Sequence, residues 1–487
     1  MGASPQVAAL GNARPRRGLT IPMATVVAAK KACVVNPLKM SQPIGAALAF
    51  MGIRGCMPLL HGSQGCTSFG LVLFVRHFRE SIPLQTTAMS EVATVLGGFE
   101  NVEQAVLNIA GRAKPEIIGI CSTGVTEVKG DDLDAFIRLI RANHPELSHV
   151  SLVCVSTPDF KDAFADGWSK AVVRMVEELV PAAPGGCELP RNARRLTVLP
   201  GSHLTPGDLD ELREIIEAFG LEPLFLPDLS GSLDGHIPDD FTPTTLGGIG
   251  LEEITRLGTS AHALALGEQM RGAALKLQER TGVPFTVLDR LTGLAPNDDL
   301  MALLARVAGV PVPGKYRRQR SQLVDAMLDG HFHFGGKKIG IGAEPDLLWS
   351  MAAFLTEMGS HVSAAVTTTN SPVLARVPAE QVVIGDLEDL ESASGECDLL
   401  ITHSHGRQAA ERLHIPLYRM GFPMFDRLGA AQRVSVGYRG TRDLIFEIGN
   451  VLMAEVHEPT PDTWRRDDEA APGYAPPRAC ACTSTSS

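Results

Sequence analysis

The residues most able to do chemistry lie in the stretch RGCMPLLHGSQGCTSFG, residues 54–70, where Cys56 and Cys66 flank a His-Gly-Ser-Gln-Gly loop. The run TSFGLVLFVRHF after the loop has helical character, so Cys66 is predicted at or just before a helix N-terminus. The helix dipole and the free amides there favour a thiolate, which is the form required of a nucleophile or of an iron or zinc ligand. Gly62 and Gly65 leave room for a bulky group near the sulfur.

The same stretch also has a purely structural interpretation. Cys56 lies in the apolar run CMPLL and is predicted to be a buried core thiol rather than a ligand. One exposed cysteine is a weak signal for a metal cluster, because iron–sulfur clusters are usually held by four thiolates. If Cys66 binds metal, the remaining ligands must come from elsewhere.

No other motif in the sequence defines a reaction. The glycine-rich segments IGIGAEPD and LGGIGLEE lack the dinucleotide fingerprint, and no phosphate-binding loop, nucleophile elbow or zinc-protease motif occurs. The pairs HFH (331–333) and HSH (403–405) could ligate a metal, but alternating pairs of this kind are usually solvated. Only the cysteine loop therefore points to a specific chemistry.

Strand-like runs alternate with helix-period segments along most of the chain. The segment SQPIGAALAFMG is predicted to be a helix that is capped by Ser41 and ends at Gly52, and CMPLL is predicted to be a strand. Further blocks that begin at PEIIGICS, RRLTVLPG and GGKKIGIG each combine an apolar run, a short turn and a helix. This alternation predicts an α/β protein of three doubly wound, Rossmann-like domains with parallel sheets.

Changes in composition predict the domain boundaries. The Pro/Gly-rich segments at 181–195 and 329–336 separate three blocks. The predicted division is a disordered extension at 1–22 (with Met23 as an alternative start), domain I with the cysteine loop at 23–190, domain II at 191–334, domain III at 335–457, and a disordered tail at 458–487.

The composition indicates a soluble, cytoplasmic protein. The 487 residues carry a net charge of −11 at pH 7, which argues against a nucleic-acid-binding or anionic-membrane-binding surface. No run reaches the ~18–20 apolar residues that are needed to span a bilayer. The nine cysteines are odd in number and scattered, which is typical of a reducing compartment rather than of a disulfide scaffold.

The cysteine loop is part of a longer pattern that resembles the β-type subunits of the nitrogenase component 1 family. The resemblance rests on SQPIGAALAFMGIRGCMPLLHGSQGC, VRHFRESIPLQTTAMSE and LGGFENVEQAVLNI, and it extends to CSTGVTEVKGDD, PDLSGSLDGH and GYRG. It covers roughly residues 23–455, and the combination of HGSQGC with RHFRE is highly specific. The family implies a fold of the kind predicted above.

Two of the three cluster cysteines of the family's catalytic β chains are missing here. Those chains supply cysteines to an eight-iron P-cluster from a C-Q-P motif, from HGSQGC and from a third segment. At the matching positions this sequence has Ser41, Cys66 and Gly124. Because neither glycine nor a neutral serine replaces a thiolate well, the resemblance implies a site to which this chain contributes one thiolate.

The resemblance therefore implies the cofactor-assembly branch of the family, in which the chain is a scaffold without catalytic turnover of its own. There, a β-type chain pairs with a NifE-type α chain as an α2β2 heterotetramer. One β-chain cysteine joins three from the α chain around an interfacial [4Fe–4S] cluster. Cys66 matches this ligand, and His61, Ser63 and Gly65 would shape the cluster loop. Cys121 is a rival ligand, although core packing is the preferred interpretation.

The precursor of the iron–molybdenum cofactor is expected mainly on the partner. The α-type chains of the family hold the cofactor through a histidine in an M-H-S-W-like segment. The closest stretch here, YRMGFPMFD, has Gly421 after Met420. The resemblance implies that the precursor is held by the α chain before it passes to apo-nitrogenase, and that the nitrogenase iron protein is a further partner.

Two alternatives stay open from the sequence. A catalytic nitrogenase β chain, or a related reductase subunit with a simpler cluster, would make the protein part of an enzyme, and Ser41 and Gly124 argue against the former. A metal-free Rossmann-like binding protein is the second alternative, in which Cys66 has only a structural role.

Overall fold

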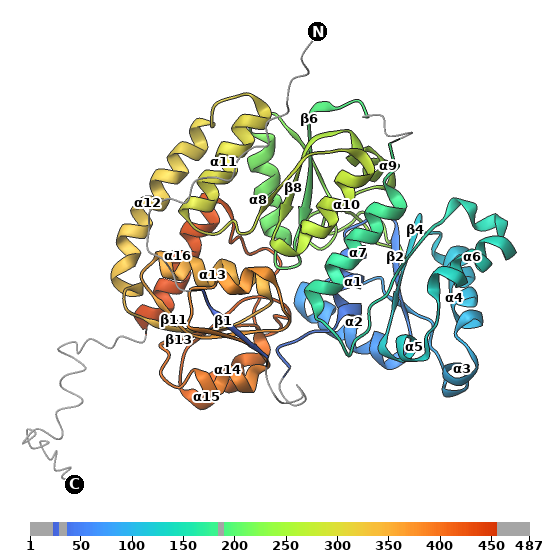
Figure 1. Cartoon of the computed structure of the whole chain (residues 1–487), viewed down its shortest axis with the longest axis horizontal. Helices are drawn as coiled ribbons and strands as arrows, with labels where there is room; N and C mark the ends of the chain where they lie inside the picture. Colours follow the sequence, from blue (N-terminus) through green and yellow to red (C-terminus); the bar gives the residue numbers. More distant parts are fainter. Residues whose placement is uncertain (1–22, 29–36, 184–188, 455–487) are drawn as a thin grey trace, which may run out of the picture.

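The computed structural model describes residues 23–28, 37–183 and 189–454 (Figure 1). The extension predicted at 1–22 and the tail predicted at 458–487 lie outside the described residues. Within these residues the strands form three sheets, and every strand pair in them is parallel. Helices pack around the sheets, so the predicted α/β class with parallel sheets is confirmed (Figure 1).

The three sheets follow one another along the chain, except that β1 belongs to the third sheet. The first has the order β3-β2-β4-β5, the second β7-β6-β8-β9 and the third β1-β12-β11-β10-β13-β14. Their strands are β2 (Cys56–His61), β3 (Gln85–Thr86), β4 (Ile117–Ser122), β5 (Ser151–Val155); β6 (Asn192–Pro200), β7 (Glu222–Phe225), β8 (Ser260–Leu266), β9 (Phe285–Leu288); and β1 (Thr25–Ala28), β10 (Lys338–Gly342), β11 (His361–Thr367), β12 (Gln381–Ile384), β13 (Leu399–Thr402), β14 (Leu417–Arg419).

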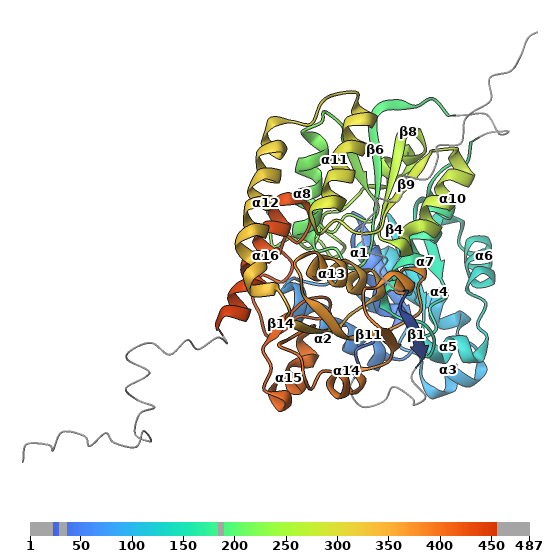
Figure 2. The ribbon, with the colours of Figure 1, turned by 60° about the vertical axis from the view of Figure 1, so that its left-hand side comes forward.

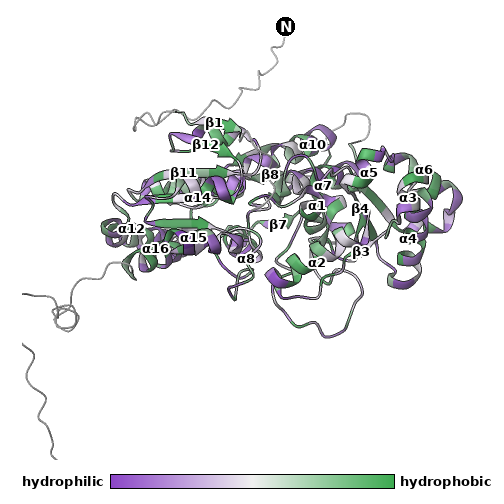
Figure 3. Cartoon of the chain, turned by 90° about the horizontal axis from the view of Figure 1, so that it is seen from below, coloured by the Kyte–Doolittle hydropathy of each residue, from purple (hydrophilic) through white to green (hydrophobic). Residues whose placement is uncertain are grey.

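The α-helices connect and cover these strands. They are α1 (Gln42–Met51), α2 (Gln64–Phe78), α3 (Glu91–Leu96), α4 (Phe99–Ala113), α5 (Gly124–Lys129), α6 (Leu133–Asn143), α7 (Phe164–Leu179), α8 (Pro206–Glu217), α9 (Leu251–Arg256), α10 (Arg271–Thr281), α11 (Leu294–Ala308), α12 (Gly314–Phe334), α13 (Pro345–Glu357), α14 (Leu387–Ala393), α15 (Arg407–Leu413) and α16 (Gly437–Ala454). Figure 3 shows hydrophobic residues concentrated on central strands such as β4 and β11, with hydrophilic residues on the surrounding helices.

Burial on both faces explains why the strands of the first sheet are continuous apolar runs in the sequence. All six residues of β4 are buried, because helices cover both faces of the sheet. Ile118 and Ile120 pack with α4 and α6 in one cluster, whereas Ile117 and Cys121 pack with α1 and α7 in the main core. This alternation follows the two-residue period of a strand.

The two helices on that inner face approach each other at backbone distance. A Cβ atom at Gly45 of α1 would lie 1.9 Å from the carbonyl oxygen of Phe164, and one at Gly167 of α7 would lie 2.0 Å from that of Gln42. Side-chain bonds fix the same contact, because Gln42 Nε2 donates to the carbonyl oxygens of Pro158 (2.9 Å) and Lys161 (2.8 Å). The predicted helix from the Ser41 cap to Gly52 is confirmed.

Helix α7 also joins the first sheet to the second. Trp168 of α7 is fully buried, and its Nε1 donates a hydrogen bond to the carbonyl oxygen of Pro200, the last residue of β6 (2.9 Å). The side chain of Ser169 reaches the carbonyl oxygen of Gln269, which precedes α10 (2.7 Å). The first and second units therefore share one continuous core.

One strand departs from the predicted domain boundaries. The predicted domain I, residues 23–190, includes β1, but β1 pairs with β12 in the third sheet, with Thr25 opposite Gln381. Figure 1 shows this dark blue strand against the orange sheet. Helix α16 packs on α12 and α11 at the other side of the molecule (Figure 2). The remaining domain boundaries stay a prediction.

The α1–α7 contact yields a stability prediction. Gly167→Ala places a methyl group against a buried carbonyl of α1, so we expect it to lower the free energy of unfolding by about 1–3 kcal/mol. The matched control is Gly111→Ala in the exposed part of α4, where no atom lies within 4 Å of the added carbon. We expect this control to raise stability by about 0.5–1 kcal/mol. Urea denaturation followed by circular dichroism measures both variants, and equal midpoints would contradict the proposed close approach.

Candidate functional site

Three loops meet at the carboxyl ends of the first sheet. The chain passes from β2 to β3 on one side and then to β4 on the other, so β2 and β4 flank the point where the strand order reverses. Ligands of open parallel sheets bind at the carboxyl ends of strands at such a point. The loops that leave β2 at His61, β4 at Ser122 and β5 at Val155 all emerge there.

Cys66 sits in the first turn of the helix that follows β2. Ser63 occupies the N-cap of α2 with extended backbone angles, and Cys66 is the third helical residue. The sequence placed the cysteine at or just before the helix, so the helix begins slightly earlier than predicted. The Cys66 side chain is partly buried, its sulfur lies 3.5 Å from Ser63 Oγ, and the thiol is free.

The loop between β2 and α2 begins at His61, whose side chain contacts two neighbouring segments. This side chain is fully buried; its Nδ1 lies 3.0 Å from Thr87 Oγ1 and its Nε2 lies 3.3 Å from Asp131 Oδ2. Burial lowers the pKa of His61, and the Asp131 carboxylate acts in the opposite direction. The backbone oxygen of His61 accepts a hydrogen bond from Thr123 Oγ1 (2.9 Å), which ties the end of β2 to the end of β4.

The glycines of the loop have different surroundings. A Cβ atom at Gly62 would lie 2.1 Å from Thr123 Oγ1, so the two loops can approach only because residue 62 is glycine. Gly65 is exposed, and the nearest atom to its Cβ position is Ser63 Oγ at 4.0 Å. The open space lies beside Cys66, whereas Gly62 serves the fold. The predicted roles of His61, Ser63 and Gly65 in shaping a cluster loop stay a prediction.

Ser41 and Gly124, the two positions where the resemblance would place further cluster cysteines, lie on neighbouring segments. Gly124 begins α5, and the Asp159 carboxylate occupies the space where a side chain at this position would project, 2.0 Å from the Cβ site. Ser41 precedes Gln42, whose side chain bonds the backbone on either side of Asp159. Asp159 was not identified from the sequence, because its proximity to Gly124 arises only from the pairing of β4 with β5.

The other cysteines of the first sheet are core residues. Cys56 and Cys121 are completely buried, and burial raises the pKa of both thiols far above the ordinary value. Burial, with the nearby Asp134 carboxylate, raises the pKa of Cys154 to about 12. The prediction that Cys56 is a core thiol is confirmed, and Cys121 packs in the core as preferred over its role as a rival ligand.

Apolar side chains are exposed around Cys66. Phe69 and Val72 follow it at three-residue spacing on α2 and are 59% and 52% exposed. Val125 and Val128 are exposed on α5, the short helix that follows β4. Large apolar residues that gather on a surface in this way are typical of a protein–protein contact.

The described residues offer only part of a metal site. Among them, no three His, Cys, Asp or Glu side chains are arranged to hold a metal ion. His331 and His333 lie in the last turn of α12, and His403 is buried beyond β13, so the HFH and HSH pairs form no such group. A single accessible thiol beside open space fits one ligand of a shared iron–sulfur cluster, because the other ligands can come from a second chain.

Comparison with known proteins identifies the relatives of the chain. Residues 41–453 match the family model described as nitrogenase component 1 type oxidoreductase. The chain is 65% identical to the nitrogenase iron-molybdenum cofactor biosynthesis protein NifN of Bradyrhizobium diazoefficiens, over 91% of this chain and 95% of the relative. It is 46% identical to the protein of the same name from Rhodobacter capsulatus, over 90% and 96%.

A solved structure shares the fold. The chain described as nitrogenase Cp1 at pH 6.5 superposes with a TM-score of 0.82 at 31% identity, covering 88% of this chain and 95% of that one. Among the residues that the structure describes, none of the helices has the length and apolar character needed to cross a membrane.

The difference in burial among the cysteines yields a labelling prediction. In the native chain we expect iodoacetamide to modify Cys66, whereas Cys56, Cys121 and Cys154 react only after unfolding, because burial keeps them as protonated, inaccessible thiols. Peptide mass mapping of native and urea-unfolded samples measures the four sites. Modification of native Cys121 as fast as that of Cys66 would show that the β4 thiol reaches the surface.

Proposed function

The chain belongs to the nitrogenase component 1 type oxidoreductase family, and from this premise we propose that it is a β-type subunit of a scaffold for iron–molybdenum cofactor assembly. The high identity to proteins named for the biosynthesis of that cofactor supports the proposal. The observation that carries it is the thiol of Cys66, the one cysteine among the described residues that is not buried, with Ser41 and Gly124 at the other two cysteine positions of catalytic β chains.

Cys66 would donate one thiolate to a [4Fe–4S] cluster shared with a NifE-type α chain. Its position in the first turn of α2 places the sulfur at the positive end of the helix dipole, which stabilises an anionic ligand. Ser63 would hold the thiolate in place through its hydroxyl, and Gly65 would leave room for the cluster. A cluster bound there supplies iron–thiolate bonds that join the two chains.

The exposed apolar side chains would exclude water from this cluster. Phe69 and Val72 lie on the same helix as Cys66, and Val125 and Val128 lie beside Gly124. Burying these side chains against the α chain would contribute ~1.5–3 kcal/mol for each one fully covered. The assembly proposed from the resemblance is an α2β2 heterotetramer that acts in the cytoplasm.

The chain would act by positioning rather than by catalytic turnover. A catalytic β chain needs thiolates at three positions, and at residue 124 the space for a side chain is filled by the Asp159 carboxylate. The cofactor precursor would be held mainly by the α chain, because Gly421 replaces the family's cofactor-binding histidine here. Apo-nitrogenase and the nitrogenase iron protein are the further partners proposed.

The ligand role of Cys66 can be tested in the complex with its α chain. We expect Cys66→Ala to lower the iron content by about four atoms per αβ pair and to abolish the EPR signal of the reduced cluster. Cys121→Ala is the matched control and should keep both, because this thiol is buried in the core. Iron analysis and EPR of anaerobically purified complexes measure the effect.

Three outcomes would count against the proposal in different ways. Unchanged iron and EPR in Cys66→Ala would remove Cys66 from the cluster. An unaltered complex free of iron would favour a metal-free binding protein. Acetylene reduction by the unaltered complex would favour a catalytic β chain.

A further inference from the structure

Asp159 carries an unpaired charge at the edge of the first sheet where the cysteine loop lies. It follows β5, and its side chain is exposed. Within the described ranges, neither a cation nor a hydrogen-bond donor is paired with its carboxylate. The backbone around it is nevertheless fixed, because Gln42 Nε2 donates to the carbonyl oxygens of Pro158 (2.9 Å) and Lys161 (2.8 Å). The fold therefore holds this charge in one place without a counter-ion.

The carboxylate occupies the space beside Gly124. Asp159 Oδ1 lies 2.0 Å from the position of a Cβ atom at Gly124, and Cγ lies 2.8 Å from the same point. The shorter distance is close to one covalent bond, so the oxygen stands where the sulfur of a cysteine at position 124 would project. The resemblance to catalytic β chains makes this position one of a cluster ligand. A charged oxygen is found there instead of a thiolate.

The loop that carries Cys66 contacts the loop that carries Gly124. Thr123 Oγ1 donates a hydrogen bond to the carbonyl oxygen of His61 (2.9 Å), and it lies 2.1 Å from the Cβ position of Gly62. Cys66 follows Gly62 by four residues and lies in the first turn of α2. The thiol and the carboxylate therefore lie on adjoining loops at the carboxyl ends of neighbouring parallel strands.

The other acidic side chains of these loops have partners, in contrast to Asp159. Glu127 Oε1 accepts a hydrogen bond from Ser156 Oγ (2.7 Å). Asp131 lies between the His61 ring and the Lys129 ammonium group, whose Nζ is 3.7 Å from Asp131 Oδ1. These contacts hold the loops together, whereas the carboxylate of Asp159 makes no such contact among the described residues. Its charge is available to act on a group bound nearby.

We propose that Asp159 tunes the reduction potential of a [4Fe–4S] cluster bound at Cys66, and that its negative charge keeps this potential lower than a neutral side chain would. This inference rests on the cluster proposed above and assigns to Asp159 no bond to iron. The reduced cluster holds one electron more than the oxidised cluster, so a nearby negative charge disfavours reduction. At an effective dielectric constant of 20, a unit charge ~10 Å from a redox centre changes a one-electron equilibrium roughly tenfold.

The α chain would strengthen this effect by covering the same edge. Phe160, the residue after Asp159, is 62% exposed, and Phe69 and Val72 are exposed on the helix that carries Cys66. Contact with a second chain would remove water from these side chains. Because charges interact more strongly where water is excluded, the carboxylate would act on the cluster with less screening. The reduced cluster would then be a stronger electron donor.

An EPR-monitored redox titration of the complex between the full chain and its α chain tests the proposal, with dithionite as the reductant. Asp159→Asn removes the charge and keeps the shape of the side chain. At the midpoint potential of the unaltered complex, we expect the ratio of reduced to oxidised cluster to rise at least tenfold, which is a shift of ~59 mV or more for one electron. Asp159→Glu keeps the charge and should change the ratio less than about threefold.

Glu116→Gln is the matched control, because it makes the same change in net charge at the opposite end of β4. Glu116 is exposed and immediately precedes β4, whose six residues separate the two ends of the strand by ~20 Å. This separation exceeds the Debye length of ~8 Å at 0.15 M ionic strength. We therefore expect this variant to change the ratio less than about twofold.

The contrary results distinguish this inference from the proposed function. An unaltered complex without a four-iron cluster would remove both. An intact cluster with an unchanged potential in Asp159→Asn would overturn the tuning role alone, as would a shift of equal size in Glu116→Gln or in Asp159→Glu. If Asp159→Asn loses iron, Asp159→Ser serves as the second neutral variant and should show the same upward shift. Loss of iron from both variants would mean that Asp159 holds the cluster rather than tunes it, and would overturn the inference.

Discussion

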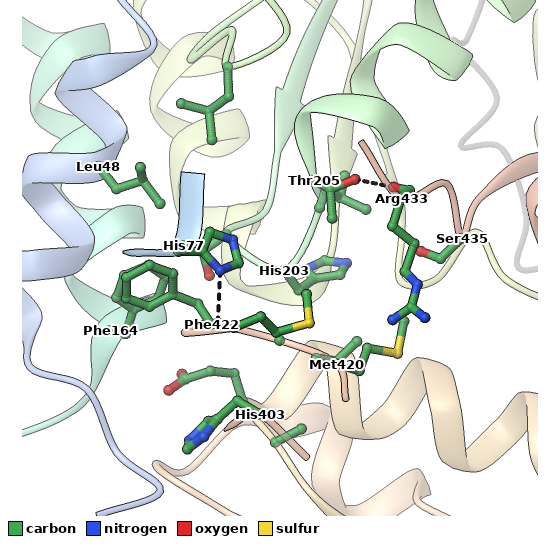
Figure 4. Close-up of a pocket in the computed structure, with 18 of the residues that line it drawn as sticks. Leu48, His77, Phe164, His203, Thr205, His403, Met420, Phe422, Arg433 and Ser435 are labelled. Carbon is green, nitrogen blue, oxygen red and sulfur yellow. Dashed lines mark hydrogen bonds between the residues drawn. The ribbon is translucent and has the colours of Figure 1, made fainter. Parts of the chain in front are cut away.

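The backbone contact between α1 and α7 is the constraint on which the cysteine loop and a central cavity both depend. Gly45 and Gly167 allow the helices to meet without intervening side chains, and this fixes the segment that carries Asp159 against the start of α1. The same helices supply Leu48 and Phe164 to the wall of the cavity at the junction of the three units (Figure 4). Through Trp168, α7 also sets the position of the second sheet. A change in this packing would therefore move the cysteine loop and the cavity together.

Local patterns predicted much of this arrangement. The cap at Ser41, the stop at Gly52 and the burial of Cys56 follow from residue type and period over a few positions, and each is confirmed. What local patterns could not provide are contacts between distant segments. The placement of β1 beside β12 and of Asp159 against Gly124 depends on which strands pair, and strand pairing leaves no mark in a single apolar run. The cavity was missed for the same reason, because its wall combines residues from all three units.

The surroundings of Gly124 bear on the proposed difference in metal ligands between this chain and the catalytic β chains. The loops at the carboxyl ends of β2 and β4 are tied to each other by the hydrogen bond from Thr123 Oγ1 to the backbone oxygen of His61. At residue 124 a carboxylate fills the space for a side chain, and at residue 41 a serine occupies the N-cap position of α1. Of the cysteines in the described ranges, Cys66 alone is not buried, and the loop that carries it is held by hydrogen bonds and a close glycine contact. The number of thiolates is thus separable from the fold that presents them.

The pairing of β1 with β12 also has a consequence for synthesis. Thr25 is made long before Gln381, and at ~5–20 residues per second the ribosome needs about 20 to 70 seconds to produce the intervening chain. During this time β1 has no partner strand, while the first and second sheets have all their strands available. The third sheet can acquire its edge only after most of the polypeptide has emerged. Its completion joins an early segment to a late one, so a ribosome that stalls between β9 and β12 leaves a chain with all the strands of the first two sheets and an unpaired β1 strand.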